Sequence, residues 1–289
     1  MIVSASRRTD IPAFFMPWLL NRLCAGFAMT RNPMNPGQVR RVDLTPPAVD
    51  AIIFWSKNPA PLLAGLGKLE AFGIPFGIAF TLNAYGSDLE PGVPPLRERI
   101  ATFRALAQRI GPRKMVWRYD PIAFSPDYDA GFHRDSFRRI ADELAGCTTH
   151  CVTSFLDFYA RTRRNLAGTS IREPAPEECS ALATELAAIA SGRGLRLEAC
   201  AESGLELPPA ACIGRKWVEA ICGHEVDAKK DPGQRKLCNC LKSIDIGTPG
   251  CCPHGCRYCY ANRSPESARL RAETTYDPDS PFLCSSPAW

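Results

Sequence analysis

The sequence lacks several signals that would assign it to a common class at once. Residues 1–8 include no apolar stretch of signal-peptide length, and no apolar run reaches the length of a membrane-spanning helix. No G-x-G-x-x-G or Walker-type loop follows a candidate strand, which argues against a nucleotide-binding Rossmann fold. We therefore expect a cytoplasmic protein with no membrane partner, whose cysteines serve for metal binding in a reducing compartment.

The composition is that of an ordinary globular chain with an unusual number of cysteines. Its 289 residues, 45% hydrophobic and 22% charged, suffice for one large α/β domain or two small ones. The net charge of +5 permits a phosphate-bearing partner but does not argue for one. Fourteen cysteines are many, yet the chain is too long and too rich in core residues to be a disulfide scaffold.

Short β-branched or aromatic runs alternate with longer amphipathic stretches, which predicts an α/β fold with a parallel sheet. The expected strands are Ile2–Ala5, Ala51–Trp55, Phe76–Thr81, Met115–Tyr119, Cys151–Phe155 and Leu195–Cys200. The expected helices are Phe15–Ala25, Pro61–Phe72, Pro95–Ile110, Phe132–Ala145 and Pro176–Gly192. This pattern fits either an open doubly wound sheet or a (β/α) barrel.

The alternation breaks down after residue 200, which divides the chain into three parts. We expect residues 1–200 to form the main (β/α) barrel body and residues 201–262 a cysteine-rich, cluster-binding region that completes it. Residues 263–289 are expected to form a terminal helix, Pro265–Glu273, and a tail. Arg31–Leu44 carries the turn signals of a small hairpin, and Ser243–Gly247 is a short apolar run.

The most informative motif is a triplet of cysteines in C-x3-C-x2-C spacing, Cys252, Cys256 and Cys259. Three thiolates so close in sequence can bind three irons of a [4Fe–4S] cube and leave the fourth iron open to a small molecule. Zinc sites usually show two C-x2-C pairs or spaced histidines, and here only Cys284 follows. The spacing therefore favours iron–sulfur over zinc or unliganded thiols. Cys251 could shift the register by one, but only Cys252 gives the x3 spacing.

A second group of cysteines lies in the loop-rich region around and before residue 240: Cys200, Cys212, Cys238 and Cys240. Their spacing is irregular and does not match a zinc ribbon. Four thiolates would hold a second [4Fe–4S] cluster or an all-cysteine zinc site. Separate buried thiols are an equal alternative, since free cysteine is a common core residue, and Cys222 is a rival ligand.

Polar residues at the strand ends form a third candidate site, because parallel α/β folds carry their chemistry at the carboxyl ends of strands. All six expected strands end in polar residues, with Arg8, Lys57 and Arg118 among them. Each residue alone is more easily explained as structural. Together, the basic side chains could hold a carboxylate or phosphate.

The triplet, with Tyr258 before its last cysteine, resembles the motif of the radical S-adenosylmethionine enzymes. Longer strings are similar to an uncharacterised bacterial radical-SAM-like family: Ser4–Phe14, Phe54–Pro59, Trp117–Pro121, Ser243–Gly247 and Cys252–Asn262. This resemblance runs from Ile2 to about Asn262 and includes the second group of cysteines. A more distant likeness, to the spore photoproduct lyase group, rests on Ser56-Lys57, Phe80–Pro91, Pro94–Ile100 and Cys259-Tyr260.

The resemblance implies a partial or full TIM-like barrel and a radical mechanism. The triplet would bind three irons, and S-adenosylmethionine would chelate the fourth. A reduced cluster would cleave S-adenosylmethionine to methionine and a 5′-deoxyadenosyl radical. This radical would abstract a hydrogen atom from the substrate. Most radical SAM enzymes carry this motif after their first strand, whereas here it comes last. The resemblance therefore implies a circular permutation that places the final strand beside the first.

The resemblance also implies roles for other residues. Ser56 and Lys57 would hold the methionine carboxylate, and Tyr258 and Asn262 would line the adenine side. The residues expected to face substrate are Arg8, Asp10, Arg118, Asp120 and Glu202.

The implied partners are a small-molecule or nucleotide substrate and a reductant such as flavodoxin or ferredoxin. One alternative is a DNA or nucleotide lesion lyase of the photoproduct-lyase type, although the basic residues are dispersed and form no aromatic–basic stripe. The other is a non-catalytic zinc- or iron-binding protein. The reaction and the substrate are not predicted.

Overall fold

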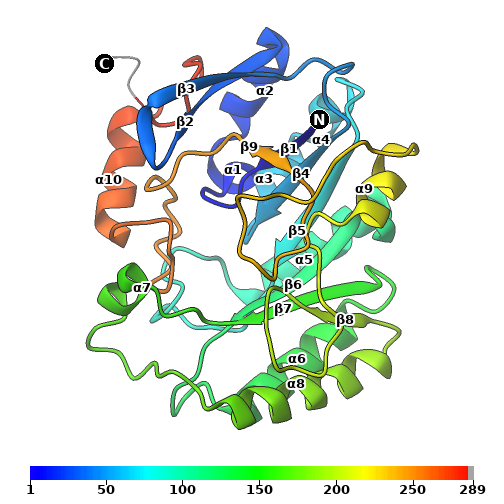
Figure 1. Ribbon diagram of the computed structural model, residues 1–289, viewed down its shortest axis with the longest axis vertical. Coiled ribbons are helices and arrows are strands. Elements are labelled where there is room, and N and C mark those ends of the chain that lie inside the picture. Colours follow the sequence, from blue (N-terminus) through cyan, green and yellow to red (C-terminus); the bar gives the residue numbers. More distant parts are fainter. Residues whose placement is uncertain (286–289) are drawn as a thin grey trace.

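Seven parallel strands form the central sheet of the computed structural model, which describes residues 1–285 and only the backbone at residue 36 (Figure 1). The strand order is β8-β7-β6-β5-β4-β1-β9. The strands are β1 (Ile2–Ala5), β4 (Ala51–Ser56), β5 (Phe76–Thr81), β6 (Met115–Ile122), β7 (His150–Phe155), β8 (Arg196–Ala199) and β9 (Ser243–Asp245). The six expected strands are confirmed, and the short apolar run before the triplet supplies the seventh.

The last strand lies beside the first, as expected. β9 pairs with β1 in parallel, with Ile2 opposite Ser243 and Ser4 opposite Asp245. The sheet is nonetheless open: among the described residues, β8 and β9 are its two edges and do not pair with each other. The full barrel that we allowed for is therefore absent from the described part of the chain. Pairing with β1 is enough to place the loop after β9 at the carboxyl end of the sheet.

Most of the helices cover one face of this sheet (Figure 1). They include α1 (Ile11–Phe14), α2 (Met16–Ala25), α3 (Ala60–Ala64), α4 (Leu66–Glu70), α5 (Leu96–Ile110), α6 (Ala130–Glu143) and α8 (Pro176–Ser191). From β1 to β8, each strand is added on the same side of the preceding one, so the connections wind in one direction. β9 is instead added on the other side of β1, so the open sheet is compatible with a partial barrel and with a doubly wound arrangement.

The expected helix Pro61–Phe72 is divided in two at Gly65. This residue ends α3, with its N–H donating to the carbonyls of Pro61 and Leu62, and α4 starts after it. Glycine is a poor helix former, so the apolar periodicity continues while the helix does not. A 3-10 turn (Pro112–Lys114) precedes β6, and α7 (Ala160–Asn165) follows β7. The helix α9 (Arg215–Cys222) had not been expected.

The opposite face of the sheet is covered by α9 and the loops of residues 200–241. Side chains from strand positions such as Ile53 and Val116 pack there against Val218 and Ile221. At Gly77, a Cβ atom would lie 2.4 Å from Ile221 Cδ1, so the close approach of α9 to β5 requires glycine. We call this side of the sheet the concave face.

The expected hairpin is confirmed as β2 (Phe27–Asn32) paired antiparallel with β3 (Asn35–Asp43). The expected terminal helix is α10 (Pro265–Thr275). The segment after it is not a loose tail in its described part. Trp18 Nε1 donates to the Ser280 carbonyl at 2.9 Å, and Cys284 is fully buried, so these residues pack against α2. Residues 286–289 of the expected tail lie outside the described residues.

None of the helices among the described residues combines the length and the apolar character of a membrane span.

Candidate metal and cofactor site

The triplet loop, residues 252–259, follows β9 and packs against the loop that follows β5. The Arg257 N–H donates to the Leu89 carbonyl at 3.0 Å, and the Gly92 N–H donates to the His254 carbonyl at 2.9 Å. Cys256 and Tyr258 join an apolar cluster with Tyr85 and other side chains at this end of the sheet. The structure thus brings the C-terminal motif to the strand ends, where the chemistry of a parallel sheet is expected.

His254 holds the triplet loop in place. Its ring is buried, with Nδ1 3.0 Å from the Gly92 carbonyl and Nε2 2.8 Å from Asp10 Oδ2. Both ring nitrogens thus face oxygen atoms, one of a backbone carbonyl and one of a carboxylate. A Cβ atom on Gly92 would lie 2.6 Å from the His254 carbonyl oxygen, so the close contact also requires glycine. His254 is therefore an anchor, paired with a carboxylate, rather than a free ligand.

Asp10 is a buried carboxylate that accepts hydrogen bonds from several segments of the chain. Its carboxylate accepts hydrogen bonds from the Ala13 N–H, as the N-cap of α1, from the Ser56 hydroxyl and from the Lys57 N–H, besides the His254 ring. These donors come from α1, from the end of β4 and from the triplet loop. The placement explains how Asp10 can position the loop, while its expected role as a substrate contact stays a prediction.

Glu90 is a second buried carboxylate at the site. Its Oε1 lies 2.8 Å from Lys57 Nζ and also accepts the Tyr258 hydroxyl, and its Oε2 lies 3.9 Å from Arg99 Nη1. Burial raises the pKa of Glu90, but the Lys57 ammonium and the Arg99 guanidinium outweigh it and leave the pKa below its usual value. Neither Glu90 Oε2 nor Arg99 Nη1 has a hydrogen-bond partner in the described structure, so this network is incompletely satisfied.

The three thiols of the triplet interact with each other through space. Burial raises the pKa of all three; at Cys252 the Asp10 carboxylate and the other two sulfurs raise it further. The Lys57 ammonium acts in the opposite direction at Cys256 and Cys259. Buried protonated thiols must lose their protons to become metal ligands, so metal binding here is coupled to proton release.

Cys251 does not share the environment of the triplet. Its sulfur lies 3.0 Å from the Thr248 carbonyl and 3.4 Å from Thr9 Oγ1, and it makes a hydrogen-bonding contact with Cys284. The neighbouring Cys252 instead interacts with Cys256 and Cys259. The placement therefore favours the register that begins at Cys252.

The residues expected to bind the cofactor lie around the triplet loop, but they differ in whether their polar side-chain atoms already have hydrogen-bond partners. Ser56 Oγ donates to Asp10 and accepts the Asn58 N–H at 2.9 Å, so it is already engaged. Asn262 donates through Nδ2 to the Cys252 carbonyl at 3.0 Å, whereas its buried Oδ1 has no partner in the described structure. Asn262 Oδ1 is thus a buried acceptor without a partner in the described structure. Lys57 Nζ is paired with Glu90 and lies beside the Tyr258 ring.

The donor set fits an iron–sulfur cluster in its chemistry, because thiolates are the usual ligands of such clusters. Among the described residues, no three His, Cys, Asp or Glu side chains already surround the position of a single metal ion. A cube places each thiolate on a different iron, so its ligands need not converge on one point.

The other four cysteines, Cys200, Cys212, Cys238 and Cys240, form a compact group that we call the four-thiol group. All four are buried in the core of the concave face. The Sγ atoms of Cys200 and Cys212 are 3.5 Å apart, and hydrogen-bonding contacts link Cys212 to Cys240 and Cys240 to Cys238. Hydrogen bonds with Cys200 and Cys240 hold the pKa of Cys212 well below its usual value. Cys222, the rival ligand, contacts the carbonyls of Glu219 and His224 instead.

Arg118 and Asp120 lie beside the four-thiol group. Arg118 Nη1 donates to Cys212 Sγ at 2.7 Å, and Nη2 pairs with Asp120, which also accepts the Ser154 hydroxyl.

The other two candidate substrate contacts lie near the strand ends. Glu202 accepts the Phe155 N–H at 2.8 Å, and burial raises its pKa. Arg8 is half-buried after β1, where its N–H donates to Ser6 Oγ at 2.9 Å. The substrate roles of these residues stay predictions.

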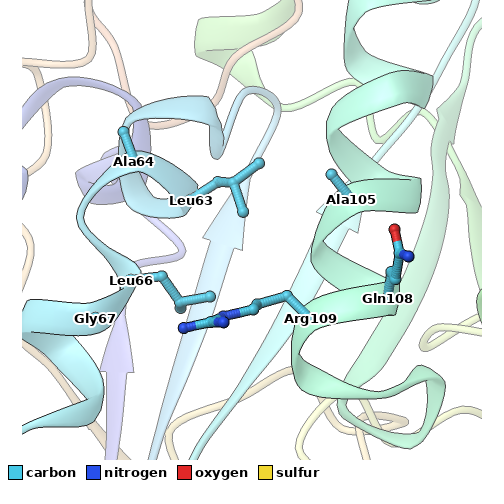
Figure 2. A pocket seen from close by; sticks show the side chains of 7 residues that line it. All are labelled: Leu63, Ala64, Leu66, Gly67, Ala105, Gln108 and Arg109. Atoms are coloured by element: carbon cyan, nitrogen blue, oxygen red, sulfur yellow. The ribbon is translucent and has the colours of Figure 1, made fainter.

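A hollow on the helical side of the sheet lies far from these cysteines in the fold. It is formed between α3–α4 and α5 and is lined by Leu63, Ala64, Leu66, Gly67, Ala105, Gln108 and Arg109 (Figure 2). Its one charged lining residue, Arg109, pairs with Glu70 at 3.3 Å. The hollow offers neither a thiol nor an acid, so we do not regard it as the functional site.

Sequence reasoning had assigned no role to Glu90, Arg99 or Arg7. For Glu90 a local signal exists, since an acid stands between Leu89 and Pro91-Gly92 in the loop after β5. Arg99 is buried inside α5 with 2% of its side chain exposed, which its helical position alone does not reveal. Arg7 stands among several polar residues after β1, and only the folded chain shows which way each one points.

A family model described as Domain of unknown function (DUF1848) matches residues 2–261. The chain belongs to this family, and the match confirms the expectation of one uncharacterised family over nearly its whole length. No curated protein and no solved structure matches the chain.

Proposed function

We propose that this member of the DUF1848 family is a radical S-adenosylmethionine enzyme, in which Cys252, Cys256 and Cys259 hold a [4Fe–4S] cluster. The observation that carries the proposal is the placement of these three mutually interacting thiols on one loop, docked at the carboxyl end of a parallel sheet. When bound, such a cluster supplies the electron that cleaves S-adenosylmethionine reductively.

The chain's own residues would position the cofactor. Lys57 Nζ is the cation best placed to hold the methionine carboxylate, which would compete with Glu90 for it. Asn262 Oδ1, a buried acceptor with no partner in the described structure, would accept an N–H of the adenine. Ser56 is committed to Asp10, so its expected contact with the carboxylate would require it to leave that partner.

Burial of the triplet loop would exclude water from the reacting groups. His254 and Tyr258 are buried, and their contacts with Asp10 and Glu90 tie the loop to β1, β4 and the loop after β5. Residues held by several partners lose little freedom on cofactor binding, which favours a preorganised site. A circular permutation relative to the usual radical SAM barrel is part of this proposal, supported by the pairing of β9 with β1.

Anaerobic reconstitution with iron and sulfide tests the proposal. We expect about four irons and matching acid-labile sulfide in the triplet cluster. The electron paramagnetic resonance signal of the reduced protein should change when S-adenosylmethionine is added, and 5′-deoxyadenosine should form. Each of Cys252→Ala, Cys256→Ala and Cys259→Ala should abolish this cleavage.

Cys251→Ala is the matched control, because Cys251 is adjacent in sequence but faces Thr9 and Cys284. It should retain iron and cleavage; if it fails while Cys252→Ala is active, the ligand register is wrong. Cleavage that persists in all three triplet variants, or zinc without sulfide at the triplet, would overturn the proposal and favour a non-catalytic metal protein. Salt-dependent retention on DNA would point to a lesion lyase within the same enzyme class.

A further inference from the structure

We propose that Cys200, Cys212, Cys238 and Cys240 bind one four-coordinate divalent metal ion, zinc by preference, which fastens residues 200–241 to the concave face. This goes beyond the proposed function, because it concerns a different site and would hold whether or not the triplet binds a cluster. It also decides between the alternatives that the spacing of these cysteines left open.

The spacing of the sulfurs favours a single ion over a cube. Sulfurs at about 2.3 Å from a tetrahedral zinc ion lie about 3.8 Å from one another. The 3.5 Å between the sulfurs of Cys200 and Cys212 is close to that edge. Thiol–thiol hydrogen bonds also link Cys212 to Cys240 and Cys240 to Cys238, so all four side chains belong to one group. In a cube each thiolate binds its own iron, which keeps the ligand sulfurs out of direct contact. The four sulfurs do not yet surround one point, so binding would turn the side chains inward as the thiol–thiol hydrogen bonds are lost.

Three guanidinium groups surround the four-thiol group. Arg118 Nη1 lies 2.7 Å from Cys212 Sγ, and Arg235 Nη2 lies 3.9 Å from Cys200 Sγ. Arg7 acts on Cys238 and Cys240 electrostatically. Four thiolates with one divalent ion carry a net charge of about −2, which neighbouring cations stabilise in a buried site.

Arg7 supplies the independent observation. In the described part of the chain its guanidinium forms no ion pair with an acid; it stacks on Trp55, with Cζ 4.8 Å from the ring centre, and Nη1 contacts Ser243 Oγ at 3.3 Å. Its Nη2 is buried with no acceptor. Arg118 and Arg235, in contrast, pair with Asp120 and Asp157. A buried N–H donor without a partner is costly, and metal-bound thiolates nearby would accept it.

The consequence of metal binding would be structural. The ligands join the end of β8 to the loops at residues 212 and 238–240, which otherwise contain little regular structure. The same region covers the concave face through Ile213, Val218 and Leu241. A structural zinc ion contributes folding free energy directly, and here it would hold these loops over the sheet.

Metal analysis of a variant without the triplet tests the proposal separately from the enzymatic one. Cys252→Ala/Cys256→Ala/Cys259→Ala, purified without added iron, should retain about one zinc per chain. Replacement by cobalt should give the absorption of a tetrahedral cobalt–thiolate centre. Adding Cys238→Ala/Cys240→Ala should remove the metal, whereas adding Cys222→Ala, the matched control, should not.

A fourth variant keeps the test valid if the variant that also lacks Cys238 and Cys240 does not fold. Arg118→Met leaves all four thiols in place and should weaken zinc binding about 10- to 100-fold, because it removes a hydrogen bond to a ligand sulfur. Iron with acid-labile sulfide at this site, or a folded triplet variant that binds no metal, would overturn the proposal. So would unchanged zinc affinity in Arg118→Met.

Discussion

The two cysteine groups lie on the same sheet but in different surroundings. The triplet thiols interact with one another only through space, and the charges that act on them include the Lys57 ammonium and the carboxylates of Asp10 and Glu90. The four-thiol group has sulfurs in hydrogen-bonding contact and guanidinium groups around them. Under the two proposals above, the same side chain serves two kinds of metal chemistry, a cluster at the triplet and a single ion at the four-thiol group.

The regions also differ in what holds them in the fold. The triplet loop is attached by buried charges and hydrogen bonds, mainly through Asp10, Glu90 and His254. The loops of the four-thiol group pack into an apolar core with Ile213, Val218 and Leu241. Substitutions that disturb the buried charges should therefore affect the triplet region and leave the metal of the four-thiol group in place.

The largest effect is expected from Glu90→Gln. It would leave Lys57 and the buried Arg99 without their carboxylate, which should lower the free energy of unfolding by about 3–5 kcal/mol. Urea denaturation measures the change. Glu143→Gln is the control, since its ion pair with Arg104 is exposed and should contribute at most about 1 kcal/mol. Equal effects of the two variants would contradict the importance of the buried network.

The same residue predicts a pH dependence. The pKa of Glu90 is lower in the folded protein than its usual value of 4.5, so its stabilisation is complete above that value. This stabilisation is lost as the pH falls through the lowered pKa. The reason is that the Glu90 carboxylate of the unfolded chain takes up a proton at a higher pH than the carboxylate of the folded chain does. Denaturation midpoints measured at decreasing pH should fall more steeply in the wild type than in Glu90→Gln. A Gln variant with the same acid dependence would assign that dependence to other groups.

A smaller effect is expected from Asp10→Ala, which would remove the acceptor of several buried donors, His254 included. We expect a loss of about 3 kcal/mol in the free energy of unfolding and a weaker iron site at the triplet. Asp129→Ala is the matched control, because Asp129 caps α6 and makes only the ordinary cap contact with the Phe132 N–H; it should lose about 1 kcal/mol. If Asp10 only contacts substrate, its variant should be as stable as the wild type.

The smallest of these effects is expected from Gly92→Ala. The added Cβ would meet the His254 backbone at 2.6 Å and push the triplet loop away, at a cost of about 1–3 kcal/mol. Reconstituted iron should fall while zinc in the four-thiol group is unchanged. Gly67→Ala is the control, since a Cβ there would meet nothing within 4 Å. Full iron loading in Gly92→Ala would show that the loop tolerates the displacement.

The local sequence pattern was sufficient to predict most of the helices and strands. All six expected strands are present, because parallel strands buried on both faces form short runs of apolar and β-branched residues. We misread the pattern at Pro61–Phe72, where Gly65 interrupts the expected helix. The pattern was insufficient for α9, which forms beside β5 where Gly77 leaves room for Ile221. The sequence pattern could not predict whether the barrel closes, since closure depends on whether the two edge strands, β8 and β9, pair with each other.

The sequence alone determined the alternation of strands and helices and the spacing of the triplet cysteines, because both depend on residues close together along the chain. Only the tertiary structure decided that Gly92 meets His254, that Glu90 joins Lys57 to Tyr258, and that Arg7 lies near enough to Cys240 to act on it electrostatically. These contacts join segments far apart along the chain. Their partners are selected by packing, charge and burial in the folded sheet, which no local pattern encodes.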